Sequence, residues 1–398
     1  MRDRAPLPPV WLMGLTNATF GMMGAISVIT LPQMLAAQGV PGGQIAAMVV
    51  TVTMPVILVA LISPILDVRF SRRAYAIVTA LITAAAVMFT VLHRSQVHAI
   101  EIAMFLGFAA ASLYQGAVGG WMGSLIDHEQ DAALGVWFSV ANIGAGGIAV
   151  VLGGELLRLS AWAAALALGG LLLAPLVLFV WIPAPGPDRK LARESFGRFT
   201  REIALLLKQR PVVTALLMFA LPSASFALTN VLSGIGADFH ASERVVSLSG
   251  GIGSSLAATA GSLAVLVFAR RIPLRMLYLS IGVVGAGFTL ALLVLPRSPV
   301  TYAVAITGEN LFQALAIATA NAIAFETMGP GNPLAATLFT VLTAVSNLPI
   351  QYMGYLDGAA YTWHSIPGAF VVDAALGLAM CALLLTTLRP WHRPPAAV

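Results

Sequence analysis

The chain has 398 residues, of which 59% are hydrophobic and 9% are charged. Its mean hydropathy is +0.91. A soluble globular protein has about 25% charged residues, so this composition excludes that class and indicates a membrane protein. The formal net charge of +5 therefore has to be explained by where the basic residues lie along the chain.

The first half of the chain contains apolar segments of about 20 residues, the length that crosses a bilayer core of about 30 Å. These six predicted spans are Leu12–Thr30, Gln44–Leu66, Ala74–Leu92, Ala99–Ile126, Ala133–Leu157 and Ala161–Ile182. The first one follows a short charged N-terminus without a small-residue cleavage site. We therefore expect a retained span and not a signal peptide.

Residues 183–210 form the one long polar interruption, and they divide the chain almost in half. Phe196, Phe199, Ile203 and then Leu206 or Leu207 recur there at helical spacing with basic residues between them. This pattern predicts an amphipathic helix on the inner membrane surface. A tether between the halves is the favoured role, and a regulatory site is the alternative.

Six further apolar segments follow this linker: Val212–Ala237, Ser247–Ala269, Met276–Leu295, Val300–Phe325, Leu334–Leu356 and Pro367–Leu388. The pattern predicts an all-α membrane protein with twelve transmembrane helices in two pseudo-symmetric six-helix bundles, residues 1–182 and 211–398. The first span contains Leu15-Thr-Asn-Ala-Thr-Phe, and the seventh echoes it with Leu221-Pro-Ser-Ala-Ser-Phe. Repeated halves with a site between them are the layout of many secondary transporters.

The basic residues lie mainly in alternate connections. With the N-terminus inside, 17 of the 21 Lys and Arg residues fall on one side, and the other side has Arg94, Arg158, Arg244 and Arg297. This bias predicts that both termini are cytoplasmic, and it accounts for the net charge without nucleic-acid binding. The single cysteine, Cys381, lies in an apolar segment, so we expect no disulfide framework, metal site or cofactor.

The loop after the second span reads Ser63-Pro-Ile-Leu-Asp67-Val-Arg69-Phe-Ser-Arg72-Arg73. It resembles the signature of the major facilitator superfamily, Gly-x-x-x-Asp-Arg-x-Gly-Arg-Arg/Lys, which lies between helices two and three. The chain departs from it by Ser63 and Ser71 in place of the glycines and by one extra residue before Arg69. The resemblance implies that Asp67, Arg69, Arg72 and Arg73 form a cytoplasmic charge-pairing latch that takes part in gating.

Within that superfamily, Glu309-Asn310-Leu311, Ala335-Ala-Thr-Leu-Phe339 and Gly354 resemble the branch of muropeptide permeases and acetyl-CoA transporters, which includes siderophore importers. Those relatives carry acidic residues in helix four just after a Gln. This chain has Gln115-Gly116 there, a departure at the expected substrate and coupling site.

Glu309 lies nine residues into the tenth predicted span, about 13.5 Å deep and close to the bilayer midplane. A charge at that depth costs at least about 2.5–3.5 kcal/mol, so burial favours its neutral form and such residues usually have a function. Asn310 and Gln313 are predicted amide neighbours, without a basic partner. We expect Glu309 to bind the coupling proton; the alternative is a permanently protonated Glu that hydrogen-bonds between helices. Asp373, about 9 Å into the last span, is either a packing residue or a second coupling site.

Amide and hydroxyl residues in several spans are the candidates for substrate binding. They are Asn17, Tyr114, Gln115, Asn142, Thr229, Asn230, Asn310, Gln313, Asn347 and Gln351. Any one of them is as well explained by a hydrogen bond between helices. In the eleventh span, Thr340, Thr343, Asn347 and Gln351 form one polar stripe, and Pro349 within it is expected to bend the helix as a gating point.

Together these features predict a monomeric, proton-coupled uptake transporter for a small organic solute, and not an enzyme. Because no Lys or Arg lies within a span, a neutral, zwitterionic or cationic solute is favoured. The alternative is an exporter or facilitator of amphipathic compounds, which the Met-rich and aromatic first span favours. Two lysines against nineteen arginines, with abundant Ala and Gly, indicate a GC-rich bacterial genome and hence the cytoplasmic membrane.

Overall fold

The computed structural model describes residues 7–68, 70–156, 158–184 and 196–388, and the elements it describes are all helices. Ten of the described helical stretches are long and apolar enough to cross a bilayer. The prediction of an all-α membrane protein is thereby confirmed. Arg69 of the predicted latch lies outside the described residues, so its role stays a prediction.

Two of the predicted spans are joined and one is broken. α17 (Ala335–Thr387) has 53 residues and leaves the helical conformation at His364 and Ser365, so it accommodates the eleventh and twelfth predicted spans. The seventh is divided between α11 (Arg210–Ala220) and α12 (Leu228–Leu232). Each of the twelve predicted spans thus has a helical counterpart, and the number that crosses the membrane stays a prediction.

Contacts between Cα atoms divide the chain into two compact units. Unit 1 is Met1–Leu206 with Met328–Ala344, and unit 2 is Leu207–Thr327 with Val345–Val398. The first turns of α17 therefore belong to unit 1 and the rest of α17 to unit 2. The predicted bundles, residues 1–182 and 211–398, differ from these units in that residues 328–344 associate with the N-terminal part of the chain.

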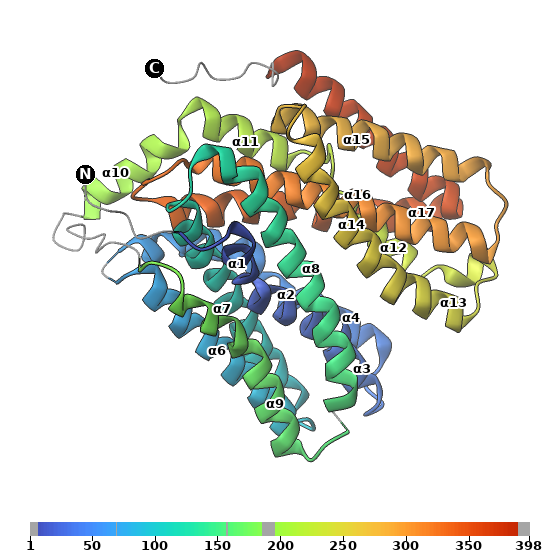
Figure 1. Ribbon diagram of the computed structural model, residues 1–398. Coiled ribbons are helices and arrows are strands. Elements are labelled where there is room, and N and C mark those ends of the chain that lie inside the picture. Colours follow the sequence, from blue (N-terminus) through green and yellow to red (C-terminus); the bar gives the residue numbers. More distant parts are fainter. Residues whose placement is uncertain (1–6, 69, 157, 185–195, 389–398) are drawn as a thin grey trace. The chain divides into compact units, whose positions relative to one another are not determined.

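Unit 1 contains the counterparts of the first six predicted spans. α6 packs along both α7 and α9, and α8 packs against α1 and α2 (Figure 1). The helices of the unit are α1 (Val10–Leu15), α2 (Ala18–Ala25), α3 (Leu31–Ala36), α4 (Gly42–Thr53), α5 (Pro55–Leu58), α6 (Arg72–Leu92), α7 (Val97–Gly123), α8 (Asp131–Leu156) and α9 (Ala161–Leu173). A π-helical turn (Ile26–Thr30) joins α2 to α3, and 3-10 turns extend the second span (Val59–Leu61, Ser63–Asp67), precede α8 (His128–Gln130) and extend α9 (Ala174–Val180).

The core of unit 1 is rich in methionine. Met22 and Met23 of the first span are buried together with Met48 and Met104 from α4 and α7. Flexible, unbranched methionine fills irregular gaps between helices well. The Met-rich character of the first span is therefore explained by packing inside this unit.

Unit 2 contains the remaining spans. A buried cluster around Leu228, Tyr302 and Phe370 joins α12, α16 and α17. The helices are α11, α12, α13 (Glu243–Leu248), α14 (Ser254–Phe268), α15 (Leu274–Ala291), α16 (Pro299–Met328) and the greater part of α17. A 3-10 turn (Gly236–Phe239) precedes α13, a π-helical turn (Ser249–Gly253) joins α13 to α14, and a 3-10 turn (Leu292–Val294) ends α15.

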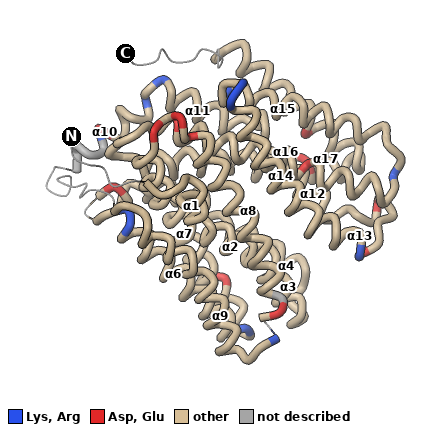
Figure 2. Tube along the Cα trace, in the orientation of Figure 1, with Lys and Arg blue, Asp and Glu red and all other residues tan. Residues whose placement is uncertain are grey.

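The linker and the charges follow the sequence pattern. The predicted amphipathic segment is helical, as α10 (Phe196–Leu207), and its position on a membrane surface stays a prediction. Figure 2 shows that most of the charged positions lie at helix ends and in the connections between helices. This distribution leaves most of each helix interior apolar, as a bilayer favours, and makes the few acidic residues inside helices stand out.

Candidate functional site

The α-helix of the first span is interrupted at Thr16 and Asn17, between α1 and α2, by a 3-10-like turn in which both residues keep right-handed helical backbone angles. The hydroxyl of Tyr114 in α7 donates a hydrogen bond of 2.5 Å to the carbonyl of Thr16. The amide nitrogen of Asn17 donates to the carbonyl of Phe138 in α8 at 3.1 Å, while its buried Oδ1 has no hydrogen-bond partner among the described residues. Two predicted substrate-binding residues thus hold this interruption in place and leave one acceptor unused.

The seventh span has a longer interruption, residues 221–227, between α11 and α12. Phe226 there has a φ of +49°, in the left-handed region that a non-glycine residue seldom adopts. Nε2 of Gln313 in α16 donates to the carbonyl of Phe226 at 3.1 Å and to Oγ1 of Thr229 at 3.2 Å. The carbonyl of Ser223 lies so close to α15 that a Cβ at Gly282 would be 1.8 Å from it.

The two interruptions fall in the two sequence segments that echo each other, residues 15–20 and 221–226. In transporters built from repeats, interrupted helices at corresponding positions supply freed backbone groups and mark the solute site. The sequence showed the echo but not the breaks. Pro222 is the local signal that pointed to the second break, because proline cannot continue a helix hydrogen-bond ladder.

The other predicted substrate-binding residues are in varied environments. Gln115 is buried in α7, and Asn142 and Asn347 are half-buried. Asn230 and Gln351 are exposed. The amide nitrogen of Asn310 donates to the carbonyl of Ile306 in its own helix at 2.8 Å, so this residue is not the amide partner expected for Glu309.

Glu309 is completely buried in α16. Its Oε1 accepts a hydrogen bond of 2.6 Å from the hydroxyl of Thr289 in α15, and its Oε2 has no hydrogen-bond partner in the described part of the chain. Neither predicted amide neighbour donates its side-chain nitrogen to Glu309. Gln313 donates to residues of the seventh span, and Asn310 donates to a carbonyl of its own helix. Thr289 is the partner that sequence reasoning missed.

Two further carboxyl groups lie close enough to interact with Glu309. Asp357 and Asp373, both in α17, interact electrostatically with it and with each other. Asp357 is completely buried, and neither of its carboxyl oxygens has a hydrogen-bond partner among the residues described. The eleventh span was predicted to end at Leu356, so Asp357 was not considered; the apolar residues that follow it were the available signal.

The ion pair expected from the loop signature is present. The guanidinium of Arg72 lies 2.8 Å from Oδ1 of Asp67, and both side chains are buried. Arg72 also donates to the carbonyls of Gly120, Asn332 and Pro333 at 3.1–3.3 Å. The carboxylate of Asp67 and these three carbonyls are thus among the partners of its guanidinium.

Asp67 also caps the N-terminus of α17. Its Oδ2 accepts hydrogen bonds from both the backbone nitrogen and the hydroxyl of Thr337, each at 2.7 Å, and its Oδ1 accepts from the nitrogen of Ala336 at 3.3 Å. A carboxylate at this position pairs orphan N–H groups and interacts favourably with the helix dipole. The start of α17 is thereby fixed to the loop after the second span within unit 1.

The remaining predicted gating residues contribute differently. The guanidinium of Arg73 lies 6.0 Å from the centre of the Trp121 ring, a cation–π distance. Pro349 lies inside α17, whose backbone stays helical there and breaks only at His364 and Ser365. The division between the units, after Ala344, lies about one turn before Pro349. Its role as a gating point stays a prediction.

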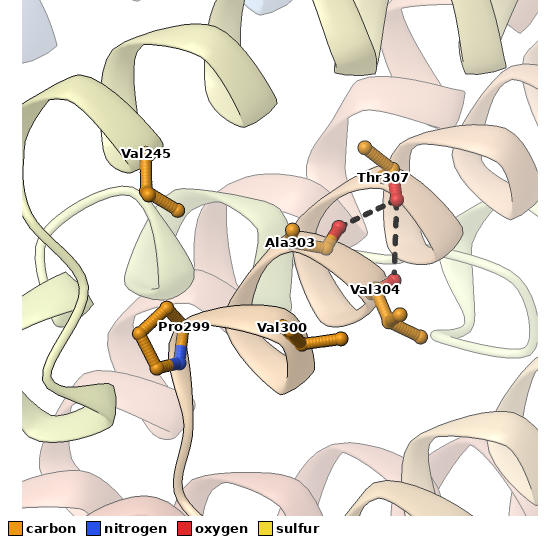
Figure 3. Close-up of a pocket in the computed structure, with 6 residues that line it drawn as sticks. All are labelled: Val245, Pro299, Val300, Ala303, Val304 and Thr307. Atoms are coloured by element: carbon orange, nitrogen blue, oxygen red, sulfur yellow. Dashed lines mark hydrogen bonds between the residues drawn. The ribbon is translucent and has the colours of Figure 1, made fainter.

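A groove of about 370 Å³ lies between α13 and α16 (Figure 3). Its lining is Val245, Pro299, Val300, Ala303, Val304 and Thr307. The one hydroxyl, that of Thr307, already donates to the carbonyls of Ala303 and Val304. These residues offer no free polar group, so the groove does not suit a polar solute. Among the described residues, no group of three His, Cys, Asp or Glu side chains is arranged to hold a metal ion.

Comparison with known proteins gives the family and the fold. Residues 13–233 match the family described as Major Facilitator Superfamily. The Escherichia coli fucose:proton symporter FucP is 13% identical with a TM-score of 0.70, covering 95% of this chain and 98% of its own. The human organic anion transporter MFSD10 (TETRAN) is 15% identical with a TM-score of 0.65, covering 94% of this chain and 98% of its own. A bacterial homologue of the iron transporter ferroportin is 14% identical with a TM-score of 0.65, covering 95% and 98%. No curated protein sequence matches the chain.

Proposed function

The chain belongs to the major facilitator superfamily and is a membrane transporter, and we propose that it couples uptake of a small organic solute to protons bound at Glu309. Transport proceeds by alternating access between two six-helix bundles. The finer assignment to the branch of muropeptide permeases, acetyl-CoA transporters and siderophore importers is part of this proposal, and it gives the first solutes to test.

The observation that supports proton coupling is the environment of Glu309. The side chain is fully buried, one oxygen has a single hydroxyl donor, and the other has no partner among the described residues. A buried carboxylate without a cation is costly, so the neutral acid is the stable form in this environment. Oε2 is therefore the site at which we place the coupling proton.

Moving this proton with the solute supplies the driving force. A potential of 100 mV contributes about 2.3 kcal/mol per elementary charge that crosses the membrane. When the conformational cycle opens Glu309 to water, the acid ionises and releases its proton. The burial cost of at least about 2.5–3.5 kcal/mol then favours rebinding a proton before the site closes again.

The polar groups proposed to bind the solute are Asn17 and Tyr114 at the first-span interruption within unit 1, and Thr229 and Gln313 at the seventh-span interruption within unit 2. These groups are uncharged, and the nearby carboxyls are acidic, so we favour a neutral, zwitterionic or cationic solute. The feature that favoured an exporter of amphipathic compounds, the Met-rich first span, is accounted for by packing in the core of unit 1. Uptake in the bacterial cytoplasmic membrane, by a monomer with both termini cytoplasmic, is therefore our first choice.

The test is accumulation of solute in proteoliposomes under a pH gradient. A solute is first chosen by thermal shift from peptidoglycan fragments, siderophores, acyl-CoA and common drugs, because a ligand stabilises the folded protein by mass action. Glu309→Gln keeps the shape of the side chain and is expected to abolish gradient-driven accumulation while solute exchange continues. Glu326→Gln, in the same helix but half-buried near Arg275, is the matched control and is expected to accumulate normally. Normal accumulation by Glu309→Gln would overturn the proposal.

A further inference from the structure

We infer that Asp357 and Asp373 form a second proton-binding site, in which the two carboxyl groups share one proton. Its role in transport rests on the proposed function, but the site itself is a property of the folded chain. The proton is bound by a carboxylate oxygen of one residue, and the resulting O–H donates to a carboxylate oxygen of the other. With a further proton on Glu309, the three carboxyls bind two protons and have one negative charge.

The placement of the pair follows from the break in α17. His364 and Ser365 are non-helical, and a Cβ on Gly368 would lie 2.4 Å from the carbonyl oxygen of Ala360. In an unbroken helix, residues eight apart are separated by about 12 Å along the axis, so this contact requires the chain to reverse. The eleventh and twelfth spans thus form a tight hairpin.

The two aspartates lie at the same level of this hairpin. Asp357 is seven residues before His364 and Asp373 is eight residues after Ser365, so each lies about 10–12 Å below the reversal. Glu309 lies ten residues, about 15 Å, from Pro299 at the start of α16. These positions agree with the electrostatic interactions among the three carboxyl groups.

No basic side chain among the residues described forms an ion pair with any of the three carboxyls. Tyr302 of α16 is buried and its hydroxyl has no hydrogen-bond partner among the described residues, but a phenol supplies no positive charge. Arg275 of α15 lies 4.0 Å from Glu326, Asp238 accepts from the hydroxyl of Tyr361, and His364 is exposed at the reversal. The carboxyl cluster therefore lacks a protein cation that would compensate its charge.

Protons are the ligand that fits this site best. Asp357 is 0% exposed and both of its oxygens lack a hydrogen-bond partner, so it presents two buried acceptors. Two carboxylates that share a buried site cannot both ionise at low cost, and one proton between them removes most of the repulsion. A metal ion is not favoured, because the three side chains are not arranged as a metal-binding group.

Infrared spectroscopy of the protein in lipid vesicles tests the site directly. Protonated carboxyl groups have a C=O stretching band that is separate from the bands of carboxylates and amides. We expect one such band to be lost both in Asp357→Asn and in Asp373→Asn, and to persist in Glu309→Gln and in the control Asp238→Asn. In the wild-type protein, 13C-labelled aspartate should shift this band, which provides the assignment even where a variant does not fold.

The inference would be overturned if the wild-type protein had no 13C-Asp-sensitive band at neutral pH. It would also be overturned if this band persisted in both aspartate variants, or if adding Na⁺ at constant pH removed it. These outcomes do not depend on transport. If Glu309→Gln accumulates solute normally while the aspartate band is present, the proposed function fails and the second site stands.

Discussion

Replacing Asp67 by Asn is expected to destabilise the chain more than its modest chemical change suggests. The substitution preserves the shape of the side chain but removes the charge that pairs with Arg72 at 2.8 Å. Arg72 then stays buried without the negative charge of its carboxylate partner. Breaking one partner of a buried ion pair costs about 3–5 kcal/mol, because the remaining charge is uncompensated.

The structure also predicts the order of smaller effects. Thr337→Val removes one hydrogen bond of 2.7 Å to the carboxylate of Asp67 but leaves the backbone donor in place. We expect this variant to lower the free energy of unfolding by about 1.5–3 kcal/mol. Glu155→Gln removes an ion pair of similar length, 3.0 Å to Arg158, in which both side chains are more than half exposed. Exposed pairs contribute about 0–1 kcal/mol.

Thermal unfolding of the three purified variants, followed by tryptophan fluorescence in one detergent, is the measurement. The expected loss of stability is largest for Asp67→Asn, intermediate for Thr337→Val and smallest for Glu155→Gln. If Asp67→Asn unfolds at the same temperature as Glu155→Gln, the buried Asp67–Arg72 ion pair contributes no net stability and the reasoning is refuted.

Three further predictions concern the helix contacts. Gly368→Ala should leave little folded protein in size-exclusion chromatography, because its Cβ would lie 2.4 Å from a backbone oxygen across the hairpin, whereas Gly287→Ala has no atom within 4 Å and should fold normally. Tyr114→Phe leaves the Thr16 carbonyl without its donor and should lower stability by about 1–3 kcal/mol in thermal unfolding. Gln313→Met removes both hydrogen bonds to the seventh-span interruption and should weaken solute binding at least severalfold. Isothermal titration calorimetry measures this affinity, and an unchanged value would show that Gln313 does not take part in solute binding.

The architecture was predictable because a bilayer imposes simple constraints. Spans must be about 20 residues long and apolar, and they must satisfy their backbone groups internally, so length and composition alone located them. The interruptions were not predictable in the same way. Thr16 and Asn17 form hydrogen bonds with Tyr114 and Phe138, which lie in other spans far along the chain. The residues next to Thr16 and Asn17 in the sequence do not indicate those contacts.

The site was predictable in part. The burial of Glu309 follows from its depth in a span, and the Asp67–Arg72 pair follows from the loop signature. The partners required tertiary structure: Thr289 is one of many threonines in apolar segments, and Thr337 gave no sign that its hydroxyl meets Asp67. Asp357 was missed because the predicted span ended at Leu356, the residue before it, whereas α17 continues to the reversal at His364.

The most direct test of the account is whether Glu309 takes up the proton that accompanies the solute. Proteoliposomes with a pH-sensitive dye inside report proton influx when solute is added outside, and radiolabelled solute reports its own flux in the same preparation. The account predicts that wild-type protein acidifies the lumen as solute enters, and that Glu309→Gln exchanges solute without acidification. Equal acidification by both proteins would contradict it.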